Sequence, residues 1–243
     1  MLPASSPTVD LKSLFALLSE WLFISGVMVA GLVIDQLWCY LIAGLVIATR
    51  QHALLILFHD AVHGHLARTR ALNDTIINAF AGVPALLPVE IYRPLHLLHH
   101  RQVGTAEDPE RLLLYAHQPW NYRPLRASAL LRQLLGDCLL VNGIRTIIAW
   151  LRQYGATPIA GRTYVIAGLW IAVIIAGAVI APDVTMRALL LWFIPLLTLT
   201  QLLQKLRSFA EHSGGPGVTP GWPFWTYSWK IGLIGRLTIW PYN

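Results

Sequence analysis

The stretch LWCYLIAGLVIATRQHALLILFHDAVHGH, residues 37–65, joins an apolar run to a group of histidines. From Leu37 to Phe58 it is apolar apart from residues 49–52, and this run is long enough to cross a bilayer, which takes about 20 residues. A continuous helix over the whole stretch would be about 43 Å long, against a hydrocarbon core of about 30 Å. We therefore expect its last turns, with His59 and His63, to project beyond the membrane.

Three further segments, residues 14–34, 163–181 and 186–203, are apolar enough to span a bilayer. Polar breaks at Asp35-Gln36 and Pro182-Asp183 separate the spans into two hairpins. Only 12% of the residues are charged, against about 25% in soluble domains. The sequence thus predicts one domain over residues 1–243, an all-α integral membrane protein with four transmembrane helices and a cytoplasmic helical region that carries the metal site.

Positive charges are spread over the polar middle and the C-terminal part of the chain. The formal net charge is +6, but no basic helix or tail is formed, so we expect no nucleic-acid partner. The two short hairpin connections carry only Arg187 between them, and the positive-inside rule then places both termini and the histidines in the cytoplasm. Cys39 and Cys138 lack a metal-binding spacing, and we expect both to be packing residues.

A second histidine group, His96-Leu-Leu-His99-His100, follows in the polar middle region. Histidines three and four residues apart on a helix project to the same side. The angle between His59 and His63 is about 40°, and the second group spans about 100°. Five neutral nitrogen donors are more than one structural metal usually takes, which indicates a polynuclear iron site.

Prolines and glycines divide the chain around the two histidine groups. Residues 78–89 are apolar but interrupted by one glycine and two prolines, so we expect an interfacial or re-entrant segment rather than a span. Pro94 lies where the first turn of the next helix would begin, and residues 104–109 are expected to end that helix in a turn. Residues 126–153 have apolar side chains at helical spacing with interleaved arginines, which is typical of helices on a membrane surface.

Several other polar residues have positions that predict a role near the histidines or within the membrane. His52 precedes His59 by seven residues on the same helical stripe, where it would line a route to the metals or donate a hydrogen bond. Asp108 is expected to accept a hydrogen bond from a ligand imidazole, whereas Glu107 fits an ordinary acidic turn equally well. Arg50 inside an apolar span should snorkel, or pair with a carboxylate or carbonyl of another helix.

Together these pieces resemble the membrane fatty acid desaturase family, the histidine-box di-iron enzymes. The matching pieces are HDAVHGH (59–65), the following Asn73, YRPLHLLHHRQVGTAEDPE (92–110) and RSFAEH (207–212). The resemblance implies an O2-dependent oxidoreductase that introduces a double bond into a fatty acyl chain of a membrane lipid. It also implies two non-haem iron ions as the cofactor and a separate ferredoxin or cytochrome-like electron donor.

The resemblance further implies which residues form the site. The metal ligands would be the histidines of both boxes and the histidine after the fourth span: His59, His63, His96, His99, His100 and His212. The residues that hold or hydrogen-bond these ligands would be His52, Asp60, Asn73, Asp108 and Glu211. No catalytic side chain is implied beyond the metal ligands.

The chain departs from the family pattern after its fourth span. The family has a third box, H-x-x-H-H, in that region, and this chain has no histidine after His212. We therefore expect a chain cut short before that box, which inserts in membranes, holds less than a full complement of iron and forms no unsaturated lipid. The alternative, a protein that ends naturally at Asn243, leaves six candidate ligands for two irons.

Three functional classes remain open. The first is an acyl-lipid desaturase or a related di-iron hydroxylase or carotenoid ketolase. The second is a membrane zinc hydrolase in which HDAVH mimics H-E-x-x-H with Asp60 as the base. Against it, aspartate is one methylene shorter than glutamate, and a single zinc ion does not need the second histidine group. The third is a non-catalytic membrane protein that keeps a metal-binding remnant.

Overall fold

The computed structural model describes residues 8–102, 105, 107–109, 127–154, 157–212 and 232–238. Within these ranges the chain is helical, apart from turns and one isolated antiparallel bridge between Val9 and Ala67. Four helical segments are long and apolar enough to cross a membrane. The prediction of an all-α fold with four membrane-spanning helices in two hairpins is confirmed.

The first hairpin consists of α1 (Leu11–Ile34) and α2 (Leu37–Val62). α1 begins three residues before the expected start because the Asp10 carboxylate caps it, accepting a hydrogen bond from the Ser13 amide at 2.9 Å. Arg50 in α2 forms an ion pair with Glu20 in α1, with 3.3 Å between Nη1 and Oε1. This pair supplies the carboxylate partner that the sequence could not name and explains how a charged residue is accommodated within an apolar span.

α2 ends at Val62 and does not continue to His65, which corrects the expected continuous helix. The break occurs at Gly64, whose φ of 82° lies in the left-handed region that glycine adopts without steric cost. His63 is the C-cap residue, so only His59 of the first histidine group lies within the helix. With 26 residues, α2 is about 39 Å long and still exceeds the thickness of the hydrocarbon core.

The second hairpin consists of α8 (Gly161–Ile180) and α9 (Pro182–Leu197), and α10 (Leu199–His212) continues the direction of α9. Pro182 begins α9, where its fixed φ suits the first turn of a helix. The helix is interrupted at Thr198, three residues after Pro195, a residue that lacks the amide hydrogen needed for the helical hydrogen bond. The fourth candidate span runs through this break, from Pro182 to Ser208.

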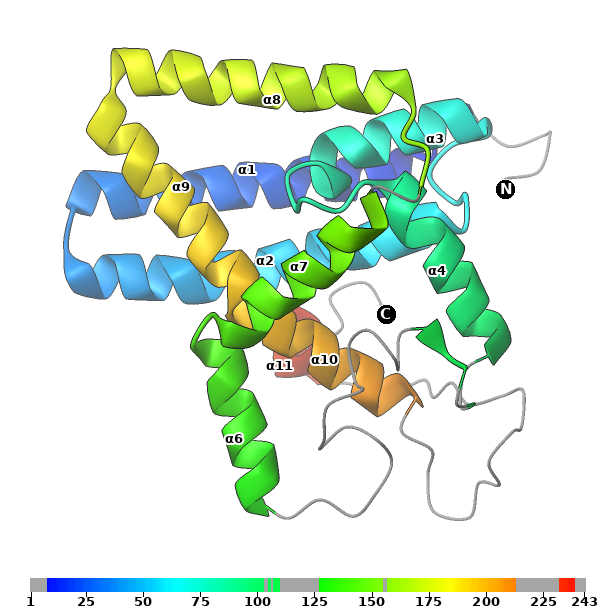
Figure 1. Ribbon diagram of the computed structural model, residues 1–243. Helices are drawn as coiled ribbons and strands as arrows, with labels where there is room; N and C mark the ends of the chain where they lie inside the picture. Colours follow the sequence, from blue (N-terminus) through cyan, green and yellow to red (C-terminus); the bar gives the residue numbers. More distant parts are fainter. Residues whose placement is uncertain are drawn as a thin grey trace.

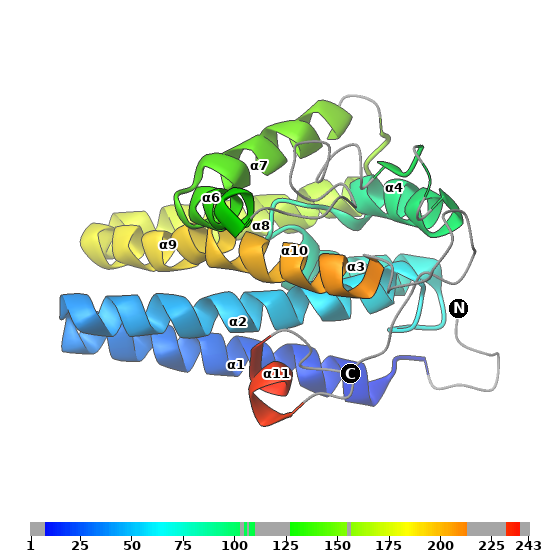
Figure 2. The ribbon, with the colours of Figure 1, turned by 90° about the horizontal axis from the view of Figure 1, so that it is seen from below.

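In Figure 1 α1, α2 and α8 run in similar directions and α9 crosses them obliquely. The α2 helix is the most buried of the four spans. The view in Figure 2 shows α2 between α1 and the layer of α9 and α10, with α6 (Ala127–Cys138) and α7 (Val141–Tyr154) on the far side of that layer. In Figure 1 the α1–α2 and α8–α9 connections lie at the same end of the bundle, while α3 (Arg70–Ile77) and α4 (Val89–Gln102) lie at the opposite end. Both histidine groups are therefore at the end opposite to the two short connections.

The segment after α3 does not span the bundle. It continues as a π-helix, Asn78–Gly82, followed by a turn, so its backbone carbonyls need partners other than those of an α-helix. Trp21, Trp170 and Trp192 provide them, donating from their indole nitrogens to the carbonyls of Phe80, Ala79 and Pro84 at 2.7, 3.0 and 3.0 Å. The three indoles also stack, with the Trp21 ring centroid 5.1 Å from that of Trp192 and 5.4 Å from that of Trp170, and so connect α1, α8 and α9 to this segment.

Two expectations about the polar region are corrected. The helix that carries the second histidine group begins at Val89 rather than at Pro94, because the side chain of Asn78 accepts a hydrogen bond from the Val89 amide at 2.8 Å and stabilises the new helix end. Cys138 at the end of α6 is exposed and is not a packing residue, whereas Cys39 is buried as expected. A short helix, α11 (Leu233–Thr238), is the last element that the structure describes.

Candidate metal centre

Four histidines from the two predicted groups converge at one point. His59 and His63 come from the end of α2, and His96 and His100 come from α4. One ring nitrogen of each lies within 4.8 Å of the others. The Nε2 atom of His96 is 3.1 Å from that of His63 and 2.9 Å from that of His100. Two nitrogens that bind one ion at about 2.0–2.1 Å lie roughly 3 Å apart, so these spacings fit a shared metal ion.

The protonation of this cluster also suits metal binding. Burial, reinforced by the neighbouring His59 and His96, lowers the pKa of His63 to about 4. Burial, reinforced by His96 and His63, lowers the pKa of His100 to about 3. Both rings are therefore neutral at physiological pH, and a neutral imidazole is the form that donates a lone pair to a metal. A set of imidazoles suits iron, zinc, copper or nickel rather than magnesium or calcium.

His99 lies beside this cluster rather than within it. Its Nδ1 atom is 2.7 Å from Oδ1 of Asp108, and both side chains are only 3% exposed. When Nδ1–H donates to the carboxylate, the lone pair of Nε2 remains available, as in the histidine–carboxylate pairs that accompany many bound metals. The expected hydrogen bond between Asp108 and a histidine of the second group is therefore present.

Two of the residues expected next to the ligands contact the site from its edge. Asp60 has its Oδ1 atom 3.4 Å from Nδ1 of His59, and its side chain is 51% exposed. Glu211, on α10, accepts a hydrogen bond from Nε of Arg207 at 2.7 Å and lines the cavity described below. The side chain of His212 lies outside the described residues, although its backbone forms the last residue of α10.

Asn73 and His52 do not contact the cluster. Asn73 is fully buried, accepts hydrogen bonds from the Leu66 and Ala67 amides and donates to the Ala61 carbonyl, so it fixes the backbone around the first group and does not bond an imidazole. His52 is also fully buried, but seven residues of helix separate it from His59 by about 10 Å. His52 does not line the cavity beside the cluster.

Tyr92 belongs to the site although the sequence pattern did not predict it. The Tyr92 hydroxyl oxygen lies 3.1 Å from Nδ1 of His96, and the two rings stack with their centroids 5.0 Å apart. When Nδ1–H of His96 donates a hydrogen bond to the hydroxyl oxygen, the lone pair of Nε2 faces the other histidines. The i, i+4 spacing of the two residues on one helix is the signal that could have revealed this contact.

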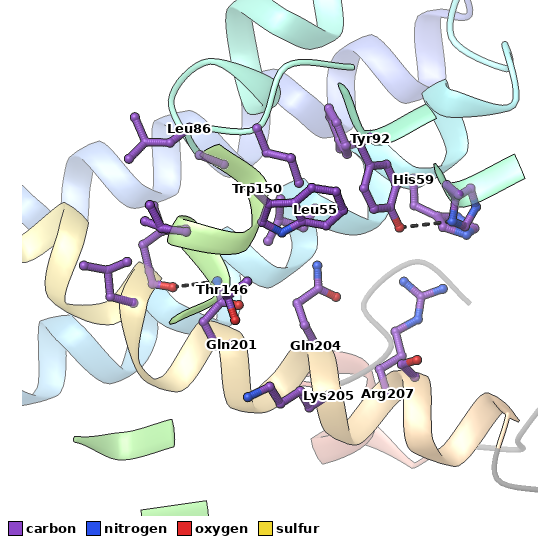
Figure 3. A pocket seen from close by; sticks show the side chains of 18 of the residues that line it. Leu55, His59, Leu86, Tyr92, Thr146, Trp150, Gln201, Gln204, Lys205 and Arg207 are labelled. Carbon is purple, nitrogen blue, oxygen red and sulfur yellow. Dashed lines mark hydrogen bonds between the residues drawn. The ribbon is translucent and has the colours of Figure 1, made fainter. Parts of the chain in front are cut away.

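A cavity of about 140 Å³ opens next to the cluster, with His59, His96 and His99 on its wall. Figure 3 shows Tyr92, Trp150 and Leu55 on one side and the α10 residues Gln201, Gln204, Lys205 and Arg207 on the other. The charges on α10 are balanced, because Lys205 pairs with Asp137 of α6 and Arg207 pairs with Glu211. The cavity thus offers a largely apolar wall beside the histidines and a polar wall opposite.

Comparisons with known proteins show the family of the chain. Residues 35–243 match the model of the family described as fatty acid desaturase. The chain is also similar to dihydrorhizobitoxine desaturase from Bradyrhizobium elkanii, with 28% identity over 189 residues. That match covers 72% of this chain and 52% of the relative, so the chain spans about half the length of the curated relative. No solved structure matches the chain significantly. Since the family match includes both histidine groups, the fourth candidate span and most of the chain, the protein belongs to the fatty acid desaturase family.

Proposed function

We propose that this protein is an O2-dependent desaturase whose two non-haem iron ions are held by histidines at the end of the bundle opposite the short connections. The observation that carries the proposal is the convergence of four imidazoles from α2 and α4 within 4.8 Å. The adjoining cavity supports catalysis over a purely structural metal site, because it gives a substrate access to the same histidines.

The proposed ligands comprise the clustered histidines, the neighbouring histidine of the second group and the histidine at the end of α10: His59, His63, His96, His100, His99 and His212. The iron ions, when bound, supply the activation of O2 and the removal of two hydrogens from an unactivated alkyl chain. The protein contributes position and electronics. Tyr92 orients His96, Asp108 orients His99, and the aromatic wall of Phe58, Tyr92 and Trp150 keeps water from the reacting carbons.

The proposed substrate is a fatty acyl chain of a membrane lipid. A cavity of about 150 Å³ holds one benzene ring, so a cavity of this size encloses only the reacting segment of a long chain. Hydroxylation and ketolation of similar chains are the related alternatives. The Bradyrhizobium relative is named for dihydrorhizobitoxine, and we include that compound among the substrates to be tested.

We further propose that the metal centre and both chain termini face the cytoplasm and that electrons come from a separate ferredoxin or cytochrome-like donor. The arginine-poor connections at the opposite end of the bundle support this orientation. Arginines of the polar region, such as Arg101, Arg145 and Arg152, would attract an acidic donor.

The zinc hydrolase alternative gains little from the structure. Asp60, the residue that would act as the base, has a half-exposed side chain and does not line the cavity. Four imidazoles at one point also exceed the three protein ligands that catalytic zinc usually takes.

Metal analysis tests the proposal. The chain is purified in detergent from iron-supplemented cells, together with His96→Gln and with His65→Gln, a matched control at an exposed histidine outside the cluster. We expect iron in excess of zinc in the native chain, loss of iron in His96→Gln and retention in His65→Gln. Zinc as the principal metal, or iron that survives His96→Gln, would exclude the proposed centre. Lipid analysis of the same cells tests catalysis separately: we expect no unsaturated product from residues 1–243, which lack the third histidine box, and a product that depends on His96 would overturn that expectation.

A further inference from the structure

The end of α2 that carries the first histidine group is held by buried polar side chains from two other helices. The last carbonyls of a helix lack partners within that helix. Here Arg93 of α4 donates from Nε to the Val62 carbonyl at 2.9 Å, and Asn73 of α3 donates to the Ala61 carbonyl at 2.8 Å. A guanidinium at this end also interacts favourably with the helix dipole.

Asp74 of α3 completes the group. Its two carboxylate oxygens accept hydrogen bonds from Nη1 and Nη2 of Arg93 at 2.8 and 2.5 Å. Asp74 is 2% exposed and Arg93 is 4% exposed, so the ion pair is withdrawn from water. A two-pronged contact between arginine and a carboxylate fixes orientation as well as distance. We refer to Asn73, Asp74 and Arg93 as the α2–α4 clamp.

The clamp lies directly beside both histidine groups. Arg93 precedes His96 by three residues, so the two project from neighbouring positions on one side of α4. On the other helix, the clamped carbonyls of Ala61 and Val62 immediately precede His63. His63 and His96 are the pair whose Nε2 atoms approach to 3.1 Å. The clamp therefore connects the backbone next to one histidine with the helical turn next to the other.

We propose that Asn73, Asp74 and Arg93 are positioning residues for the metal centre, which set the spacing of His63 and His96 through the backbone of α2 and α4. The inference rests on the proposed metal-binding function. Within the part of the chain that the structure describes, their hydrogen bonds go to backbone atoms and to one another rather than to an imidazole, so they act through the elements that they hold together.

A neighbouring residue provides a matched control. Arg70 of α3 approaches the same Asp74 carboxylate, with 3.9 Å between Nε and Oδ2, but its side chain is 62% exposed. Because an exposed pair at this distance contributes little, Arg70→Gln changes the charge near Asp74 without disturbing the clamp. Arg93→Lys keeps the buried charge but loses the forked contact, and Asp74→Asn keeps the shape but loses the charge.

The experiment titrates Co(II) into the metal-free 243-residue chain in detergent and compares the native protein with Arg93→Lys, Asp74→Asn and Arg70→Gln. Three quantities are measured: the Co(II) dissociation constant, the visible absorption of bound Co(II), which reports its coordination geometry, and the melting temperature without metal. We expect Arg93→Lys and Asp74→Asn to bind Co(II) about tenfold or more weakly, with an altered spectrum, because residues around the ligands typically contribute about 10- to 100-fold in affinity. Arg70→Gln should match the native protein.

Native affinity and spectrum in both clamp variants, with only a lower melting temperature, would make the clamp purely structural and overturn the inference. An equal loss of affinity in Arg70→Gln would also overturn it, since the effect would then follow general charge. If a charged variant does not fold, Asn73→Ser gives the same readouts from the mildest change. A native chain that binds no Co(II) would overturn the proposed metal-binding function and the clamp with it, whereas native binding with unaffected variants counts against the clamp alone.

Discussion

Replacement of Asp108 by asparagine should weaken metal binding about tenfold. The carboxylate lies 2.7 Å from Nδ1 of His99, and both side chains are almost fully buried, so solvent screens their contact little. A hydrogen bond to a charged group contributes about 1.5–3 kcal/mol, and a neutral one contributes about 0.5–1.5 kcal/mol. Asparagine can still accept the hydrogen bond through its amide oxygen, so the loss is the difference, about 1–1.5 kcal/mol. Since about 1.4 kcal/mol corresponds to a factor of ten, the dissociation constant should rise about tenfold.

The assay is a competition titration of the purified chain with a chelator of known affinity, at one pH and ionic strength. Asp108→Ala removes the acceptor altogether and should weaken binding further, by up to about 100-fold. Glu107→Gln is the matched control, because that acidic residue is exposed and adjacent in sequence. An unchanged dissociation constant for Asp108→Asn would refute the reasoning that the Asp108–His99 pair supports a metal ligand. The same loss in Glu107→Gln would refute it too, because the effect would not depend on the buried contact.

Three further predictions test other parts of the structure. The exposed thiol of Cys138 and a cysteine introduced by Asp183→Cys should react with membrane-impermeant reagents from opposite sides of the membrane. Labelling of both cysteines from the same side would contradict the four-span topology. Asn78→Ala removes three hydrogen bonds of the buried Asn78 side chain and should lower the free energy of unfolding by about 3 kcal/mol in a denaturant titration. A change below about 1 kcal/mol would contradict the inference that Asn78 stabilises the start of α4. Burial lowers the pKa of His63 to about 4 and that of His100 to about 3, against 6.5 in an unfolded chain. The free energy of unfolding of the metal-free protein should therefore be at its full value above about pH 6.5 and fall as the pH decreases toward 4. A denaturation midpoint that stays constant over this range would contradict this prediction.

The spans and the shared direction of the histidines within each group were predictable from local information. A bilayer requires a long apolar run, and the sequence contains four of them with polar breaks at Asp35 and Pro182. Helical spacing likewise places His96 and His100 on one side of α4, where the structure brings them to His59 and His63. These features depend on neighbours within a few residues, which is the range over which sequence patterns are informative.

The features that the sequence did not predict depend on residues far apart in the chain. The start of α4 is set by Asn78, eleven residues before Val89, and so the proline at position 94 was misleading. The partner of Arg50 is Glu20, thirty residues away on another helix. The three tryptophans that bond the re-entrant carbonyls come from three different helices. Hydrogen-bond partners of this kind are fixed by packing, and no spacing rule identifies them.

The histidines of the site are held from outside by acceptors that leave their inner nitrogens directed at one another. Asp60 lies at Nδ1 of His59, the Tyr92 hydroxyl lies at Nδ1 of His96, and Asp108 lies at Nδ1 of His99. The contacts inside the cluster, by contrast, join Nε2 atoms, those of His96 with His63 and with His100. An acceptor at Nδ1 favours the tautomer whose Nε2 carries a lone pair. The rings of these proposed ligands are therefore oriented before a metal arrives, which lowers the reorganisation that binding requires.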